Sequence, residues 1–116
     1  MRQCLMLDLK DDAEAIAAYE AHHRAVWPEV LAQLRDEGVL QMEIYRLGTR
    51  LCMLMETDDA RFDAERMARR AAADPRIQAW EALMSRFQQA TPFSEPGRKW
   101  TPAALIFDLK GSSPRP

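Results

Sequence analysis

Four stretches of the chain alternate between apolar residues and residues of other kinds, a pattern typical of β-strands. The four stretches are residues 3–9, 39–47, 50–57 and 104–109. In the first, Leu5, Leu7 and Leu9 share one face of the predicted strand. Only Gly48 and Thr49 separate the second from the third, and glycine at the first position of a two-residue loop is typical of a type II′ turn. These two strands are therefore expected to form a hairpin.

The segments between the strands carry apolar residues three and four positions apart, which predicts helices. The predicted helices cover residues 13 to about 27, 28–37, 60–73 and 75–87. The residue before a proline avoids helical backbone angles, so Pro28 interrupts the first pair of helices at Trp27. In the second pair, Asp74 is expected to cap the later helix, with Pro75 at its first position.

The order of these elements predicts an α+β fold of the ferredoxin-like, split β-α-β kind. Such a subunit has a four-stranded antiparallel sheet with its helices on one face. The 116 residues fit a single domain over 1–110, and the Gly-Ser-Ser-Pro-Arg-Pro run at 111–116 predicts a loose tail.

The second face of the predicted sheet is more apolar than a solvated face should be. It carries Cys4 and Met6 from the first strand. The third strand adds one of two pairs, Cys52 with Leu54 or Met53 with Met55. A second copy of the chain is the simplest cover for such a face, so a homodimer with the two sheets facing each other is expected.

Charge and composition exclude several classes of partner. With 16 Lys and Arg against 18 Asp and Glu, the net charge of −2 does not suit a protein that neutralises phosphates, so no nucleic-acid partner is expected. The longest uncharged apolar run near the amino end, residues 4–7, is too short for a membrane span or a targeting segment. Cys4 and Cys52 lie in alternating stretches and suit small core residues in a reducing compartment, which predicts a cytoplasmic protein.

The candidate chemistry centres on His22 and His23, the two histidines of the chain. Tyr19 and His23 are four residues apart, so on a helix their phenol and imidazole share one face and can reach the same small ligand. Both groups exchange protons with oxygen atoms, and imidazole does so near neutral pH. Spacing alone leaves open the alternative of two solvated histidines beside a core tyrosine.

No metal or nucleotide cofactor is expected. Adjacent histidines point about 100° apart on a helix and cannot both bind one ion. Sulfur atoms of the methionines and cysteines in the strands could bind copper, but at alternating positions such residues more often fill a core. The four glycines are isolated, so the chain has no glycine-rich phosphate loop.

The tryptophans and two charged strand residues have alternative interpretations. Trp80 lies on the apolar stripe of its helix and suits the core, whereas Trp27 and Trp100 stand among charges at element boundaries, where aromatic residues commonly line pockets. Glu43 and Arg46 face opposite sides of the second strand. Each of these two charges suits either a cleft or a solvated rim.

Several of these features together carry a family resemblance. In chain order they are Tyr19 and His23, the run Val26-Trp27-Pro28-Glu29, Gly38, and Ile44-Tyr45 of the hairpin. Over residues 2–109 the sequence resembles the L-rhamnose mutarotase family of small sugar 1-epimerases. The resemblance implies a dimeric α+β barrel of ferredoxin-like subunits. It also implies that His23 is the proton donor and that Tyr19 binds the substrate.

Two positions depart from the pattern of the rhamnose enzymes. Met42 stands where those enzymes have a tyrosine on the second strand, and Ala79-Trp80 stands where they have paired tryptophans. Relative to those enzymes, Ala79 is therefore expected to remove most of one aromatic wall of the pocket. Other runs are similar to the branch described as L-fucose mutarotases, among them Met53-Leu54-Met55-Glu56, Asp74-Pro75 and Pro96-Gly97-Arg98-Lys99-Trp100. The resemblance thus implies L-fucose as the substrate, with L-rhamnose as the alternative, and places Met42 and Trp80 beside Tyr19 among the substrate-binding residues.

Mutarotation needs no cofactor, because it only moves a proton from the anomeric hydroxyl and another to the ring oxygen. His23 is the expected acid/base, and the complementary group is Glu43, Asp8, Asp108 or a bound water. A different function also suits this fold, which hosts unrelated activities. That alternative is a monooxygenase-like or ligand-binding dimeric barrel with a wide apolar cavity.

Overall fold

The computed structural model describes residues 1–111. The predicted tail at 111–116 therefore lies outside the described residues apart from its first residue. The elements, in chain order, are β1 (Arg2–Leu9), α1 (Ala13–His23), α2 (Pro28–Asp36), β2 (Val39–Leu47), β3 (Arg50–Thr57), α3 (Ala64–Ala73), α4 (Pro75–Ser85), β4 (Gln88–Gln89) and β5 (Thr101–Pro102).

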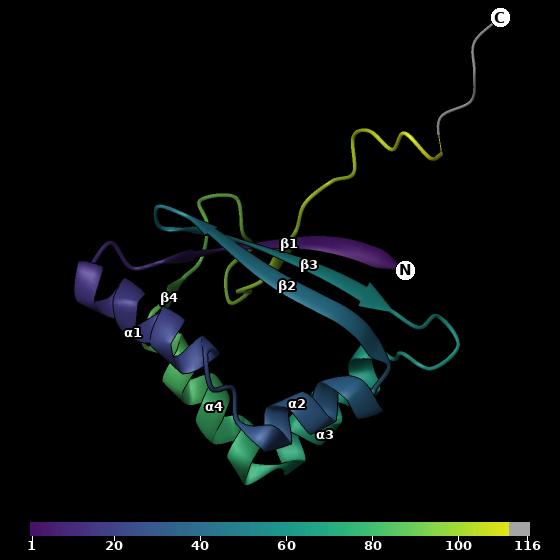
Figure 1. Ribbon diagram of the computed structural model, residues 1–116, viewed down its shortest axis with the longest axis horizontal. Coiled ribbons are helices and arrows are strands. Elements are labelled where there is room, and N and C mark those ends of the chain that lie inside the picture. The colour runs from purple at the N-terminus through teal and green to yellow at the C-terminus, as the bar shows by residue number, and fades with distance from the viewer. Residues whose placement is uncertain (112–116) are drawn as a thin grey trace, which may run out of the picture.

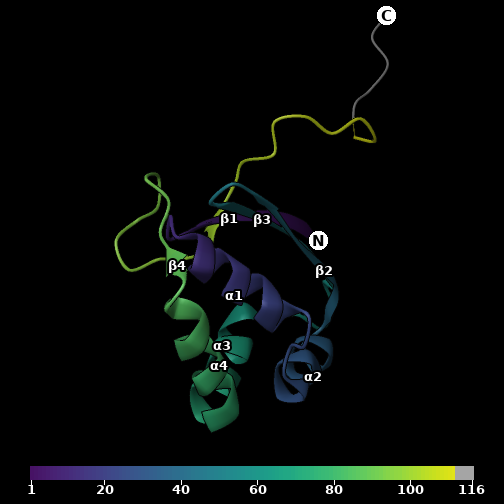
Figure 2. The ribbon, with the colours of Figure 1, turned by 60° about the vertical axis from the view of Figure 1, so that its left-hand side comes forward.

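The strands form one antiparallel sheet in the order β2-β3-β1-β4, and β5 pairs with β1 as well. The short strands β4 and β5 bind different parts of β1, at Asp8–Leu9 and at Leu5–Met6. All four helices lie on one side of the sheet (Figures 1 and 2). This arrangement confirms the predicted α+β, ferredoxin-like class.

Local sequence signals set the ends of the helices. The Asp12 carboxylate accepts a hydrogen bond from the Glu14 amide at 2.9 Å and caps α1. Trp27 has extended backbone angles and Pro28 opens α2, which confirms the predicted break between these helices. The predicted start of α3 at residue 60 is too early, because the helix begins at Ala64, after its cap at Asp63.

Three glycines, Gly38, Gly48 and Gly97, occupy backbone conformations that other residues rarely adopt, and the first two lie at turns next to β2. Gly38 lies between the end of α2 and the start of β2 and has a φ of +95°. A Cβ at this position would lie 3.1 Å from the Cβ of Arg61. Gly48 has a φ of +60° in the hairpin, and no other kind of residue in the range 1–111 has a positive φ. A type I′ turn needs a positive φ at both central residues, whereas a type II′ turn needs it only at the first. Gly48 has a positive φ and Thr49 does not, so these angles fit the predicted type II′ turn.

The core fills the space between the sheet and the helices. Leu7, Leu9 and Leu51 are fully buried on the inner face of β1 and β3, and each contributes roughly 1.5–3 kcal/mol through burial. Buried Tyr19 and Trp80 pack against them from α1 and α4. A second cluster, formed by Val39, Met53 and Met55, continues the core along the sheet.

The outer face of the sheet, turned away from the helices, carries the alternative Cys52 and Leu54 rather than Met53 and Met55. Together with Cys4 and Met6 of β1, these residues form a half-buried apolar surface. Both cysteines are free and their Sγ atoms lie 3.1 Å apart. They are therefore residues of the outer face and not of the core, because their neighbours Leu5, Leu51 and Met53 occupy the inward positions.

The predicted last strand at 104–109 is wrong. Regular pairing ends at Pro102, and residues 103–109 have no strand or helix. The cause lies in the register, because Pro102 already stands opposite Leu5 and β1 begins only three residues before Leu5, at Arg2. A longer last strand in this position would therefore run past the end of its neighbour. Among the described residues, no helix is long and apolar enough to cross a membrane.

Candidate active site

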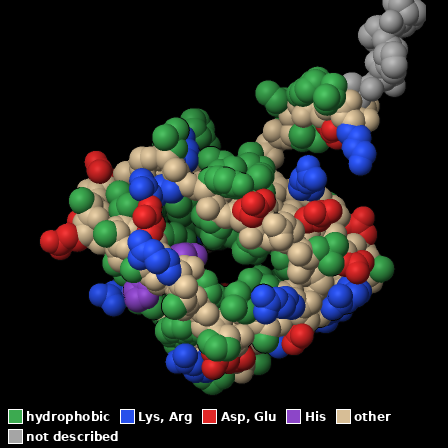
Figure 3. Space-filling model, viewed as in Figure 1, with side chains coloured by type: hydrophobic (Ala, Val, Ile, Leu, Met, Phe, Trp, Pro, Cys, Tyr) green, Lys and Arg blue, Asp and Glu red, His purple; other side chains and the backbone are tan. Residues whose placement is uncertain are grey.

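A cavity of about 1070 Å³ lies between the inner face of the sheet and the helices. Its walls come from all four helices, from the hairpin strands β2 and β3, from β4, and from the segment that precedes β5. The space-filling view shows the hollow, with histidine side chains beside it (Figure 3). The volume is slightly above the range of about 300–1,000 Å³ that is usual for ligand sites in proteins. A monosaccharide would therefore fill only part of this cavity.

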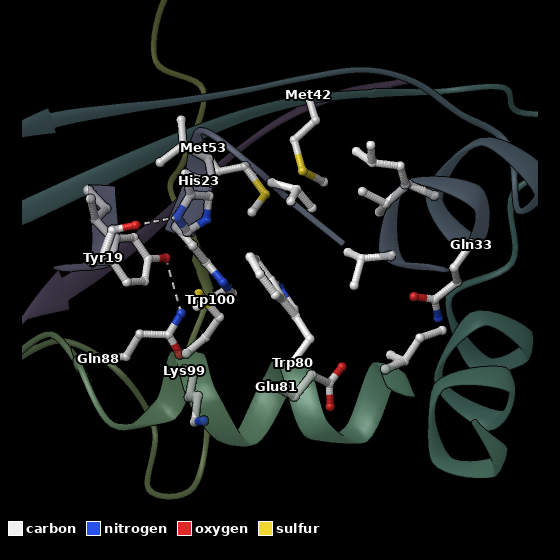
Figure 4. Close-up of a pocket in the computed structure, with 18 of the residues that line it drawn as sticks. Tyr19, His23, Gln33, Met42, Met53, Trp80, Glu81, Gln88, Lys99 and Trp100 are labelled. Carbon is white, nitrogen blue, oxygen red and sulfur yellow. Dashed lines mark hydrogen bonds between the residues drawn. The ribbon is translucent and has the colours of Figure 1, made fainter. Parts of the chain in front are cut away.

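Tyr19 and His23 lie together at one end of the cavity (Figure 4). They occupy the last two turns of α1, and their ring centroids are 4.4 Å apart. Nδ1 of His23 lies 2.8 Å from the backbone carbonyl oxygen of Tyr19. A carbonyl oxygen only accepts hydrogen bonds, so Nδ1 carries the proton and Nε2 of the neutral ring has a free lone pair. His23 is thereby prepared to act as a base at Nε2.

The adjacent His22 has a different environment. Its ring lies beside Phe87, with centroids 5.8 Å apart, and it does not line the cavity. The structure therefore separates the two histidines as helix geometry requires, because neighbours on a helix point in different directions.

Tyr19 is held in a polar contact inside an apolar wall. Only 3% of the residue is exposed, and Nε2 of Gln88 donates a hydrogen bond to its hydroxyl oxygen at 3.2 Å. Burial raises the pKa of Tyr19, and the hydrogen bond from Gln88 offsets part of this shift. Because the hydroxyl oxygen accepts from Gln88, the hydroxyl hydrogen remains available to a ligand.

Trp80 forms the wall next to His23 and also belongs to the core. The two ring centroids are 5.7 Å apart in an edge-on arrangement, and the tryptophan is only 7% exposed. On its other side Trp80 contacts Trp27, and the Arg76 guanidinium lies 4.0 Å from the centroid of the Trp27 ring. Trp27 thus supports Trp80 from behind rather than lining the pocket, whereas Trp100 does line it, as expected.

The remaining walls are mainly apolar. Met42 and Met53 project from the sheet into the cavity, and Gln33 lies at the end opposite Tyr19 (Figure 4). Nε2 of Gln33 donates to the backbone oxygen of Met67 at 3.2 Å, so its amide is engaged by α3.

The position of Ala79 corrects an expectation, because this residue is exposed on α4 and does not line the cavity.

The carboxylates expected as the complementary base lie elsewhere. Asp8 binds Arg50 through two contacts of 2.8 and 3.1 Å on the outer face, and Glu43 accepts from the Tyr45 hydroxyl there at 3.1 Å. Asp108 follows β5 and also lies outside the cavity lining. Asp8 and Glu43 lie on the outer face because alternation along a strand sends neighbouring residues to opposite faces.

Two other carboxylates do line the cavity, and sequence reasoning missed both. Glu20 forms an ion pair with Arg46 of β2. Arg46 therefore lies on the cavity wall with Glu20. Glu81 lies beside Trp80 on α4 (Figure 4). The four predicted site residues, Tyr19, His23, Met42 and Trp80, are brought together in the same cavity. Within residues 1–111 no three His, Cys, Asp or Glu residues are grouped as a metal site would require.

Comparison with known proteins gives a consistent set of relatives. A family model described as L-rhamnose mutarotase matches residues 2–109. The chain is 54% identical over 110 residues to the L-fucose mutarotase of Xanthomonas campestris, covering 93% of this chain and 87% of that protein. It is 32% identical over 98 residues to the L-rhamnose mutarotase of Rhizobium meliloti, covering 81% of this chain and 86% of that protein.

Among solved structures, the crystal structure of an L-rhamnose mutarotase from Formosa agariphila is similar with a TM-score of 0.68. That match has 21% sequence identity and covers 94% of this chain and 98% of that one. At this level of identity the likeness concerns the fold.

Proposed function

The chain belongs to the L-rhamnose mutarotase family, and we propose that it interconverts the α and β anomers of L-fucose. As a sugar mutarotase it is an isomerase. The observation that carries the proposal is the pair formed by Tyr19 and His23, in which a carbonyl oxygen fixes the tautomer of an imidazole inside a cavity. The relative named L-fucose mutarotase, at 54% identity, supports the choice of sugar.

His23 is the principal acid/base in the proposed mechanism. Its Nε2 takes the proton of the anomeric hydroxyl while the bond between C1 and the ring oxygen breaks, and C1 becomes an aldehyde. The ring oxygen takes a proton from a water molecule, which recovers one from the imidazolium. Rotation about the C1–C2 bond exposes the other face of the aldehyde, and the reverse transfers close the ring.

The other predicted residues bind and orient the sugar. The hydroxyl of Tyr19, fixed by Gln88, donates a hydrogen bond to a sugar oxygen. Trp80 offers a flat apolar face to the carbon-bound hydrogens of the ring. Met42 lines the cavity at the position where the rhamnose enzymes have a tyrosine. Its thioether cannot make the hydrogen bonds of a tyrosine hydroxyl to a sugar, and this difference supports L-fucose over L-rhamnose.

We also propose that the protein is a homodimer and works in the cytoplasm. The half-buried apolar outer face, with Met6 and Leu54, supports the first statement, because exposed apolar surfaces commonly mark interfaces. The free thiols of Cys4 and Cys52, at 3.1 Å, suit a reducing compartment.

Exchange between anomers, measured by saturation-transfer NMR, tests the proposed activity. Separate samples contain L-fucose, L-rhamnose or D-galactose, each with and without the protein. The expected result is accelerated exchange, fastest for L-fucose. A protein that accelerates none of the three sugars would contradict the mutarotase proposal and favour the ligand-binding barrel.

A further inference from the structure

The sugar of the proposed reaction carries more hydroxyl groups than Tyr19 and His23 can bind. The anomeric hydroxyl belongs to Nε2 of His23. The rings of the two residues are 4.4 Å apart, so the oxygen that receives the Tyr19 hydroxyl lies close to C1 and is the ring oxygen or the C2 hydroxyl. The C3 and C4 hydroxyls lie farther from C1. They need other partners, because a buried hydroxyl without a hydrogen bond weakens binding.

Glu20 and Arg46 bring a carboxylate and a guanidinium group to the same cavity. Glu20 lies on α1, three positions before His23 and so about one turn of helix away. Arg46 lies on β2, four positions after Met42, so alternation turns both of these side chains to the inner face of the sheet. The two charged groups therefore reach the cavity from the elements that carry the imidazole and the thioether.

Contacts within the chain hold the guanidinium of Arg46 in place. Its Nε donates a hydrogen bond to Oε1 of Glu20, and its Nη1 donates to the backbone carbonyl of Gly48 at 2.9 Å. The first contact joins β2 to α1, and the second ties the side chain to the hairpin turn. A planar group fixed at two of its nitrogens has few orientations left, so its other N–H groups point in defined directions.

Both members of the ion pair keep groups that can bind a ligand. Among residues 1–111, no hydrogen bond involves Nη2 of Arg46 or Oε2 of Glu20. The two side chains are 35% and 42% exposed, which places them between the cavity and solvent. A sugar hydroxyl can donate to the free carboxylate oxygen and accept from the free guanidinium nitrogen. Because the two charges cancel, the pair suits a neutral sugar.

We propose that Glu20 and Arg46 bind the C3 and C4 hydroxyls of the sugar and so contribute to the choice of substrate. L-Fucose and L-rhamnose have opposite configurations at C2 and C4, and their C3 and C4 hydroxyls are cis in the first sugar and trans in the second. A fixed pair of donor and acceptor distinguishes these arrangements, because a hydroxyl that points the wrong way loses its partners. This inference rests on the proposed mutarotase function and adds two binding residues to it.

Deoxy sugars test the proposal in a cycle that pairs a side chain with a hydroxyl. NMR measures kcat/KM for anomer exchange by the wild type, Glu20→Gln and Arg46→Met, with L-fucose and its 2-deoxy, 3-deoxy and 4-deoxy forms. Comparing variant with wild type on the same sugar cancels the intrinsic reactivity of that sugar. Both substitutions should lower kcat/KM for L-fucose about 10- to 100-fold, mainly through KM.

The loss should depend on which hydroxyl the sugar carries. It should shrink at least about threefold with 3-deoxy-L-fucose or 4-deoxy-L-fucose, and it should stay full with 2-deoxy-L-fucose. Equal losses with all four sugars would show that the ion pair only supports the structure, and would overturn the proposal. A loss that shrinks with the 2-deoxy sugar alone would overturn the assignment to C3 and C4.

Arg70→Met is the matched control. Arg70 has the same side-chain exposure as Arg46 and forms an ion pair with Asp36 at 3.2 Å, but it does not line the cavity. This variant should leave kcat/KM unchanged for every sugar, and a loss equal to that of Arg46→Met would contradict the proposal. Circular dichroism verifies folding of all variants, because exposed ion pairs contribute little to stability.

Sugar binding, measured separately, distinguishes failure of this inference from failure of the proposed function. Titration is followed through the fluorescence of Trp80 and Trp100, which line the cavity. A wild type that binds L-fucose without exchanging its anomers would contradict the mutarotase function, but the same pattern of losses in Kd would still support the ion pair as a sugar site. Absence of both exchange and binding would overturn the function and this inference together.

Discussion

The two ends of the cavity are built by different means. At one end, hydrogen bonds from Gln88 to Tyr19 and between His23 and the Tyr19 carbonyl fix the groups that can exchange protons. Toward the other end the lining is mainly thioether and aliphatic, and the amide of Gln33 is turned to α3. We infer that the polar end performs the proton transfers, while the shape of the apolar lining selects the sugar.

The largest expected effect comes from removing the imidazole. His23→Ala should slow anomer exchange of L-fucose roughly 100- to 10,000-fold, the usual contribution of acid–base catalysis. His22→Ala is the matched control and should leave the rate nearly unchanged, because its ring lies outside the cavity. NMR exchange rates at saturating sugar measure both. Equal losses in the two variants would show that the polar end is assigned to the wrong residue.

Removing the phenol oxygen should have a smaller effect at the same end. Tyr19→Phe keeps the packed ring but loses the hydroxyl and leaves the Gln88 amide without this acceptor, so kcat/KM should fall about 10- to 100-fold. Thr57→Val removes a hydroxyl that donates to the Met1 carbonyl, outside the cavity lining, and serves as the control in the same NMR assay. An unchanged rate in Tyr19→Phe would exclude Tyr19 from substrate binding.

The apolar lining should affect selectivity more than rate. The wild-type chain is expected to prefer L-fucose over L-rhamnose at least about tenfold in kcat/KM, because buried sugar hydroxyls without partners are costly. Met42→Tyr should narrow this preference, whereas Leu40→Tyr, at an exposed position of the same strand, should not. A preference for L-rhamnose in the wild type would contradict the specificity role of Met42.

The smallest expected effect concerns the ion pairs of Glu37, which join α2 to α3 near the apolar end of the cavity. Hydrogen bonds from Arg66, and secondarily from Arg70, lower the pKa of Glu37 despite desolvation, and these contacts join the end of α2 to α3. A carboxyl with a lowered pKa in the folded state stabilises the protein above its unfolded pKa, and the contribution disappears as the pH falls through the folded pKa.

Glu37→Gln should therefore lower the melting temperature at pH 7, and the difference from wild type should shrink in acid. Thermal unfolding followed by circular dichroism at pH 7 and pH 3 measures it. A difference that persists unchanged at pH 3 would assign the effect to packing rather than charge.

Local signals made much of the fold and part of the site predictable. The strands β1–β3 follow from alternation, and the meeting of Tyr19 with His23 follows from one helical spacing. Contacts between distant segments leave no such signal. Gln88 reaches Tyr19 across 69 positions of sequence, so its role required the structure.

The errors have a related cause, because a pattern within one segment does not identify its neighbours. Alternation at 104–109 predicted a strand, but a strand also needs an edge to pair with, and β1 ends too early. Ala79 in place of a tryptophan predicted the loss of an aromatic wall of the pocket, but α4 turns this residue toward solvent.

The most direct test of the division between the two ends is the rate of anomer exchange of L-fucose and L-rhamnose by His23→Ala. If His23 only transfers protons, both rates fall by the same factor and the preference between the sugars stays as in the wild type. A fall for one sugar with little change for the other would show that His23 selects the substrate, and would contradict the account.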